Sequence, residues 1–214
     1  MKKSILLVLS QFIILLAFGQ YGSTMPVPAS HPVFEQSLAG VPLSGTKAYG
    51  YDVFSNLFLS MDLPGFDHLM AHNSGPGPYG ITCLDFDSQG DLWGFDGISL
   101  YKQDFNSNTM TSAGSVSGLS FYVCSGMAWD ADREVMFLIA FNWLGFGLSQ
   151  SYLYAINLTT HSANLIGTIP GVDACLSLAY SASEDRLYTV DFNNGNLVRI
   201  NPNSAASEVA GNIG

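Results

Sequence analysis

The stretch Arg186-Leu-Tyr-Thr-Val-Asp-Phe-Asn-Asn-Gly-Asn-Leu-Val-Arg-Ile-Asn201 holds two short segments rich in β-branched, aromatic and aliphatic residues. They lie on either side of Asn193-Asn-Gly195. Such segments favour strands, and Asn-Gly between two of them is a strong short-range signal for a hairpin. We therefore expect two antiparallel strands here, joined by a tight type I′ turn.

Related units precede this hairpin at a loose period of roughly 43 to 53 residues, the range of propeller blades. Three sets of anchors recur from unit to unit: Phe86, Trp129 and Tyr180; Trp93, Phe137 and Tyr188; and Tyr101, Tyr154 and Val198. Apolar and polar residues alternate clearly in Leu153-Tyr-Ala-Ile-Asn-Leu158, as in a half-buried strand. Each unit therefore reads as four short antiparallel strands.

Four strands per repeat, repeated about four times, predict an all-β chain folded as a β-propeller of four-stranded antiparallel blades. We expect full blades at residues 80–118, 123–171 and 174–214, and a partial blade at residues 47–73. Residues 21–46 would then form an N-terminal linker or an atypical first strand. The composition agrees, because 48% of the residues are hydrophobic and only 11% are charged, the reverse of a disordered chain.

The blade sequence also resembles a known group of repeats. Leu153-Tyr-Ala-Ile-Asn157 with Ile166-Gly-Thr-Ile-Pro-Gly171 is similar to the blades of secreted bacterial proteins of the NHL, YVTN and quinoprotein propeller families. The resemblance implies the fold and says little about function. Rings in these families commonly have six or seven blades, which favours a fragment of a larger ring. A closed four-bladed ring and a ring completed by two chains are the alternatives.

The N-terminus predicts export. Lys2-Lys3 is followed by the apolar run 5–18 and by the small residues Ala17 and Gly19, the order of a secretory signal peptide. We assign residues 1–20 to this signal, which resembles those of secreted Bacteroidetes proteins, and expect a secreted or periplasmic protein. After cleavage we expect no insertion into a membrane. The net charge of −10 also disfavours nucleic acid and anionic membrane surfaces as partners.

Three cysteines open equivalent first strands: Cys83, Cys124 and Cys175. Because an odd number cannot pair completely, we expect three buried, unpaired thiols on the innermost strands of successive blades.

Several polar clusters could form a metal site or a catalytic site, but for each of them we favour a structural role. His68 and His72 have no third ligand, and the turn at 191–196 lacks the acidic ligand of a calcium loop. Asp85 and Asp87 could do acid–base work, but acids at the ends of inner strands more often solvate a channel mouth. We therefore expect no metal site and no cofactor, and we assign no catalytic residue.

An aromatic, glycine-rich insertion at residues 141–150 is the one irregularity of the repeat. It predicts a binding loop with Trp143, Leu144 and Phe146 as contact residues, because aromatic side chains on loops of a rigid scaffold favour recognition. The alternative is a long hairpin whose aromatic side chains fold back on the blade. The function expected is a non-catalytic module that binds a glycan, peptide or protein. The alternative is a propeller enzyme, such as a polysaccharide lyase, a hydrolase or a quinone-dependent dehydrogenase.

Overall fold

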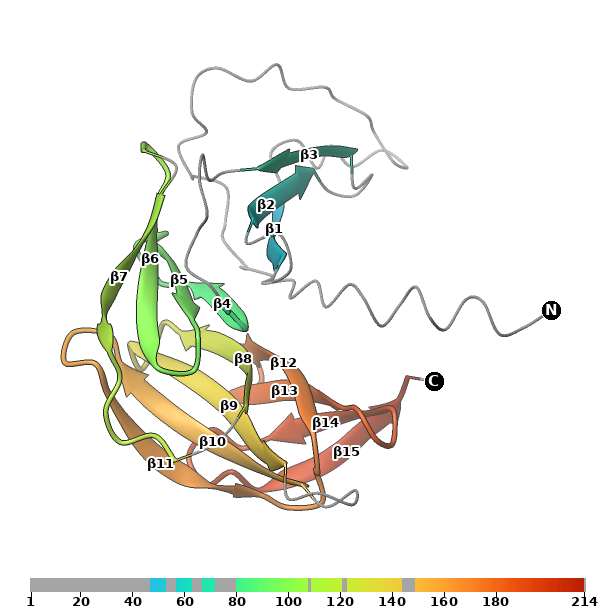
Figure 1. Cartoon of the computed structure of the whole chain (residues 1–214). Coiled ribbons are helices and arrows are strands. Elements are labelled where there is room, and N and C mark those ends of the chain that lie inside the picture. The colour runs from blue at the N-terminus through green and yellow to red at the C-terminus, as the bar shows by residue number, and fades with distance from the viewer. Residues whose placement is uncertain are drawn as a thin grey trace.

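The computed structural model describes residues 47–52, 57–62, 67–71, 80–107, 109–120, 123–143 and 149–213. Every regular element in this part of the chain is a β-strand, as predicted. The strands form one three-stranded sheet and three four-stranded sheets, all antiparallel (Figure 1). The three-stranded sheet contains β1 (Lys47–Asp52), β2 (Leu57–Asp62) and β3 (Asp67–Ala71).

Each four-stranded sheet is a meander in which strands consecutive in sequence are neighbours in space. The first contains β4 (Cys83–Phe86), β5 (Leu92–Phe95), β6 (Ser99–Asp104) and β7 (Thr109–Ser115). The second contains β8 (Val123–Asp130), β9 (Val135–Trp143), β10 (Ser149–Asn157) and β11 (Ser162–Ile169). The third contains β12 (Cys175–Ser181), β13 (Arg186–Asp191), β14 (Asn196–Ile200) and β15 (Ser207–Asn212). We call these sheets blades A, B and C.

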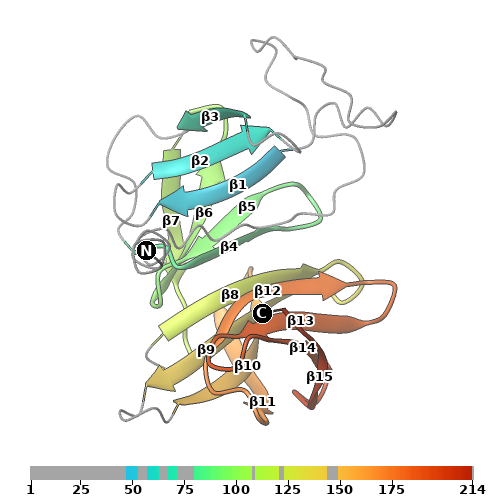
Figure 2. The same ribbon diagram turned by 90° about the vertical axis from the view of Figure 1, so that its right-hand side faces the viewer.

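The blades meet through their first strands, because β8 contacts both β4 and β12 (Figure 2). Apolar side chains fill the space between adjacent blades. Phe95 and Leu100 of blade A pack with Met136 and Leu138 of blade B. Phe137 and Leu153 of blade B belong to a second core with Leu187, Val198 and Ile200 of blade C. Burial of these facing surfaces is the main favourable contribution to holding the blades together.

A glycine in the fourth strand of every blade marks a repeated β-bulge. The pairing of third and fourth strands shifts directly before Tyr101, Tyr154 and Val198. The extra residue on the fourth strand is Ala113, Ile166 or Ala210, and Gly114, Gly167 or Gly211 follows it. Since a bulge bends and twists its strand, the recurring glycine records a bend at the same place in each blade.

The hairpin between β13 and β14 exists as predicted, but its turn type was predicted wrongly. Asp191 pairs with Asn196, so the loop contains the four residues 192–195 rather than two. The amide of Gly195 donates to the carbonyl of Asp191 at 2.9 Å, and Gly195 has a φ of 64°. A four-residue turn closed by a left-handed glycine therefore replaces the type I′ turn.

The segment that connects blade A to blade B lies along the outer edge of β11. Ser117 forms a parallel bridge with Ser162. Its amide donates to the carbonyl of His161 at 3.0 Å, and its carbonyl accepts from the amide of Ala163 at 2.8 Å. This contact, which we call the strap, ties the end of blade A to the last strand of blade B.

Among the described residues, no helix has the length and apolar character that crossing a membrane requires.

Candidate functional site

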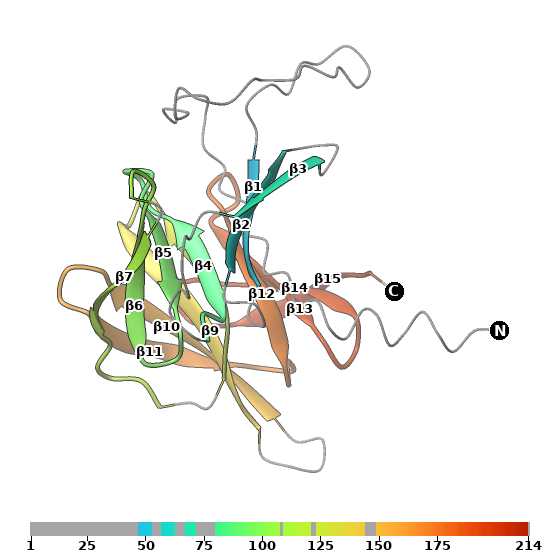
Figure 3. The ribbon, with the colours of Figure 1, turned by 45° about the horizontal axis from the view of Figure 1, so that its top comes forward.

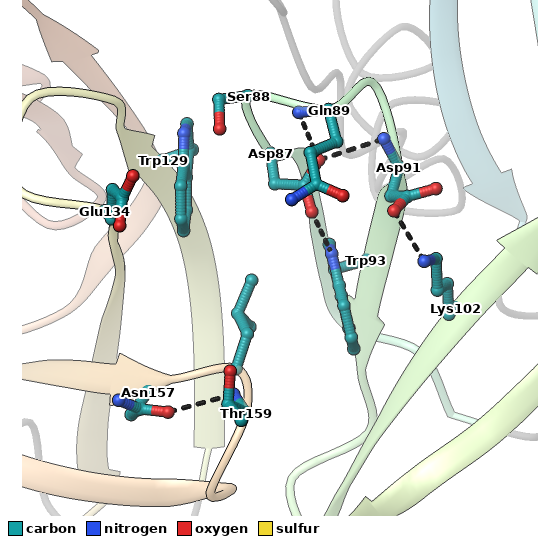
Figure 4. A pocket seen from close by; sticks show the side chains of 11 residues that line it. Asp87, Ser88, Gln89, Asp91, Trp93, Lys102, Trp129, Glu134, Asn157 and Thr159 are labelled. Carbon is teal, nitrogen blue, oxygen red and sulfur yellow. Dashed lines mark hydrogen bonds and ion pairs between the residues drawn. The ribbon is translucent and has the colours of Figure 1, made fainter.

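A cleft of about 420 Å³ opens between blades A and B. The turn between β4 and β5 forms one wall and the end of β8 the other, with the β10–β11 turn closing one side (Figure 4). The cleft has the size of a small-molecule site. Its lining residues are Asp87, Ser88, Gln89, Asp91, Trp93, Lys102, Trp129, Glu134, Asn157, Leu158 and Thr159.

The blade A wall is held rigid by one buried carboxylate. Asp87 Oδ2 accepts the indole N–H of Trp93 at 2.9 Å, and Oδ1 accepts the backbone amides of Gln89 and Asp91 at 2.8 and 3.0 Å. Lys102 Nζ lies 2.5 Å from Asp91 Oδ2 and 5.5 Å from the centre of the Trp93 ring. Figure 4 shows the Trp93 ring between Lys102 and the cleft. The ring is thus oriented before any ligand arrives.

The blade B wall is Trp129, whose backbone is anchored to blade A. The amide of Trp129 donates to Asp85 Oδ2 at 2.7 Å, across the boundary between the blades. Burial raises the pKa of the Asp85 carboxyl to about 7, partly offset by the amides that donate to it. The indole Nε1 of Trp129 is buried and has no hydrogen-bond partner among the described residues. A buried donor without a partner is costly, so it favours an acceptor brought to this wall.

At the next boundary, between blades B and C, an arginine of blade B bridges to blade C. Arg133 Nη1 and Nη2 donate to the two oxygens of Asp185 at 2.7 and 2.8 Å, and Nη1 also lies 2.5 Å from Asp130 Oδ2. Arg133 lowers the pKa of the Asp185 carboxyl, chiefly through these hydrogen bonds. Beneath this clamp the rings of Phe137 and Tyr180 pack with centroids 6.4 Å apart.

Aligning the blades explains the difference between the two boundaries. Arg133 precedes its second-strand anchor by four residues, as Gln89 precedes Trp93. Asp185 precedes its anchor by three residues, as Glu134 does in blade B. Blade A therefore carries a neutral, exposed Gln89 where blade B carries the clamping arginine, and Glu134 faces it without the ion pair. The cleft between blades A and B therefore lies where an ion pair equivalent to that of Arg133 and Asp185 is absent.

Glu134 is held in a strained backbone conformation at the rim of this cleft. Its φ is 53°, and Gly90 occupies the equivalent turn position in blade A with a φ of 81°. A left-handed conformation costs a non-glycine residue on the order of 1 kcal/mol. The turn therefore retains a carboxylate where glycine would fit better.

The predicted contact residues at 141–150 are only partly within the described structure. Trp143 is the last residue of β9 and pairs with Ser149, the first residue of β10. Leu144 and Phe146 lie outside the described residues. Strands β9 and β10 have nine residues each, and Figure 3 shows their hairpin extending past the neighbouring strands. Much of the supposed insertion is thus added strand length.

The polar residues that the sequence analysis considered as metal or acid–base sites have structural roles where the structure describes their side chains. Asp85 and Asp87 were expected to solvate a channel mouth, and this prediction is wrong: both are hydrogen-bond acceptors that hold the cleft walls. Asp191 is buried, and its carboxylate binds the amide of Asn193 and the side chain of Asn194 within its own turn. His68 lies in β3, and His72 lies outside the described residues. In the ranges described, no three metal-ligating side chains gather.

The cysteines are buried on the first strands β4, β8 and β12, as predicted. The thiols of Cys83 and Cys124 meet between blades A and B, with their sulfur atoms 2.8 Å apart. All three cysteines are free in this structure, as predicted, but the contact between two of them was not predicted.

No known protein-family model matches the sequence. No curated protein matches it either.

Solved structures match at the level of the fold. A chain of a nidogen–laminin complex, a propeller-type protein, superposes with a TM-score of 0.52 over 80% of this chain and 67% of its own, at 9% identity. A Bacteroides thetaiotaomicron protein described as of unknown function gives 0.51 at 14% identity, over 76% of this chain and 40% of its own. An auxiliary nutrient binding protein from Bacteroides ovatus gives 0.50 at 12% identity, over 76% and 38%. The chain thus spans less than half the length of these two Bacteroides proteins. The predicted fold is confirmed: the chain is built of β-propeller blades, about three to four in number.

Proposed function

We propose that this chain is an exported, non-catalytic binding module and that the cleft between blades A and B holds a carbohydrate. The observation that carries the proposal is the missing clamp. At equivalent positions Arg133 bridges blades B and C through Asp185, whereas Gln89 of blade A lines an opening together with Trp93 and Trp129.

The chemistry of the lining favours a sugar over other small ligands. Trp93 and Trp129 lie on opposite walls of the cleft (Figure 4). Indole rings offer large, rigid apolar faces that can cover the C–H faces of a pyranose. Glu134, Asn157 and Gln89 add oxygen and amide groups suited to hydroxyl donors and acceptors. A sugar hydroxyl near Trp129 would also supply the acceptor that its Nε1 lacks.

The hydrogen bonds of Asp87 and the ion pair of Asp91 support binding rather than catalysis. Asp87 already accepts three hydrogen bonds, and Asp91 is paired with Lys102. Carboxylates committed in this way position the walls and are poor candidates for moving protons during a reaction. Export is supported by the sequence of residues 1–20 alone.

The β9–β10 hairpin is a second proposed contributor to recognition. Trp143 ends the long strand β9, and Leu144 and Phe146 stand between β9 and β10 in the sequence. Replacing residues 144–148 by Asn-Gly tests this contribution separately from the cleft. Loss of binding without a change in melting temperature supports a contact surface, whereas a large fall in melting temperature identifies a structural flap.

The cleft is tested with an array of plant, microbial and host glycans, followed by calorimetry with the best soluble oligosaccharide. Trp93→Ala and Trp129→Ala should each weaken binding about 5- to 30-fold, the range for truncating an aromatic anchor. Phe192→Ala is the matched control, because Phe192 is an exposed aromatic residue on the β13–β14 turn of blade C. Trp129→Phe guards against misfolding, since Trp129 packs against the core between blades A and B.

Three results would each overturn the proposal. The first is retention of wild-type affinity by both tryptophan variants. The second is binding of no glycan on the array, and the third is turnover of a bound glycan by the purified protein.

A further inference from the structure

Two thiols from neighbouring blades are in contact at the centre of the molecule. Cys83 begins β4 in blade A, and Cys124 lies near the start of β8 in blade B. Both are buried, with exposed fractions of 0% and 3%. Their sulfur atoms are 2.8 Å apart, only about 0.8 Å more than the roughly 2.04 Å of a sulfur–sulfur bond.

We infer that Cys83 and Cys124 form a disulfide that joins the first strands of blades A and B. Strands β4 and β8 contact each other at the boundary between the two blades, and this contact already brings the two sulfur atoms within 2.8 Å. For its occurrence in the cell the inference rests on the export proposed above, because disulfides persist in oxidising compartments.

Cys175 begins β12 at the equivalent position in blade C and shows what an unpaired thiol looks like here. Its sulfur contacts the hydroxyl of Ser125 at 3.7 Å, and burial raises the pKa of this thiol to about 11. If Cys83 and Cys124 are bonded to each other, Cys175 is the third cysteine and remains a reduced thiol.

The bond forms by exchange with an external disulfide, such as that of an oxidoreductase or oxidised glutathione. One cysteine loses its proton, and its thiolate attacks the external disulfide to give a mixed disulfide and one released thiolate. The second cysteine loses its proton and attacks the sulfur of the first, releasing the other external thiolate. Two cysteine thiols are oxidised, one external disulfide is reduced to two thiols, and the two protons end on those thiols.

The order of events follows from burial. Once the blades have packed, burial and the neighbouring Cys124 thiol raise the pKa of Cys83 well above its ordinary value. The reactive species is the thiolate, so the folded, reduced protein should oxidise slowly. The bond is therefore expected to form while blades A and B assemble.

The experiment counts thiols on the full chain after its refolding with oxidised and reduced glutathione. The refolded protein is denatured, alkylated with iodoacetamide without reduction and weighed by mass spectrometry, and a peptide map locates the bond. We expect one modified cysteine, Cys175, before reduction and three after it, with Cys83 and Cys124 in one linked peptide pair. Alkylation of all three cysteines without reduction would overturn the inference, as would a bond that includes Cys175.

Stability provides a second readout. A phosphine reductant should lower the melting temperature of the wild type and of Cys175→Ser by roughly 5–15 °C. It should not alter the melting temperature of Cys83→Ser or Cys124→Ser. Equal sensitivity in all four proteins would contradict the inference. Neither the thiol count nor the melting temperature involves a ligand. A negative result would therefore disprove the disulfide without bearing on the proposed glycan site.

Discussion

Replacing Gln89 by arginine should rebuild in blade A the clamp that bridges the next boundary. The arginine at 133 reaches Asp185 through two hydrogen bonds of 2.7 and 2.8 Å. Gln89 and Glu134 occupy the corresponding turn positions on either side of the cleft. In Gln89→Arg the new guanidinium is therefore expected to pair with Glu134 across the opening.

The expected gain in stability is small and the expected loss of binding is large. The existing clamp is partly exposed, with 30% of the Arg133 side chain accessible to solvent. Partly exposed ion pairs contribute about 0.2–1 kcal/mol, or roughly 1–4 °C in the melting temperature of a chain of this size. The same side chain would bridge the opening of the cleft between its two walls, so affinity for the oligosaccharide should fall at least about tenfold.

Calorimetric binding and thermal unfolding measured on the same samples separate the two effects. Gln89→Met is the matched control, since methionine has a similar length and cannot form the ion pair. Gln89→Arg combined with Glu134→Gln removes the partner and should lose the gain in stability. The reasoning is refuted if Gln89→Arg binds like the wild type, or if Gln89→Met abolishes binding to the same extent.

Three further predictions concern stability. Gly126→Ala should lower the melting temperature by about 2–12 °C, the effect of 1–3 kcal/mol of overpacking, because its Cβ would lie 2.5 Å from the Ser177 carbonyl carbon. Gly211→Ala, where the added atom meets nothing within 4 Å, should be neutral, and equal effects of the two changes in differential scanning calorimetry would contradict this account. The native pKa of Asp85 lies above its ordinary 3.8, so its stabilising contribution should fall as pH rises from about 4 to about 7, by up to roughly 4 kcal/mol. Chemical denaturation at several pH values should show this fall in the wild type relative to Asp85→Asn, and parallel curves would exclude it. Glu134→Gly should raise the melting temperature by a few degrees through relief of its positive φ, while calorimetry detects weaker glycan binding; unchanged affinity would remove Glu134 from the site.

Local patterns predicted the strands well because each blade is formed by residues close in sequence. Trp93, Phe137 and Tyr188 lie in the second strands β5, β9 and β13, as their spacing indicated. The burial of the three cysteines was predicted for the same reason: each lies at or near the start of the first strand of its blade, and the repeat buries that part of every blade.

The candidate site could not be predicted in this way, because it depends on a difference between repeats rather than on a motif. Counting from the anchors Trp93 and Phe137 aligns Gln89 with Arg133 in the sequence, but only the structure shows that Arg133 bridges to Asp185 of the next blade. The contact between Cys83 and Cys124 likewise depends on how closely adjacent first strands approach. The turn at 192–195 was mistaken because Asn-Gly fits both two-residue and longer hairpins.

The strap at Ser117 has a consequence for the behaviour of the protein at high concentration. An outer strand with unpaired amides and carbonyls is a template on which a second molecule can add a strand and begin to aggregate. At β11 the carbonyl of His161 and the amide of Ala163 are already bonded to Ser117. Gly118 follows so closely that a Cβ there would lie 2.3 Å from the carbonyl oxygen of Ala163. A larger side chain at this position would push the strap away and uncover the start of β11, so one glycine keeps this part of the edge from pairing with a second molecule.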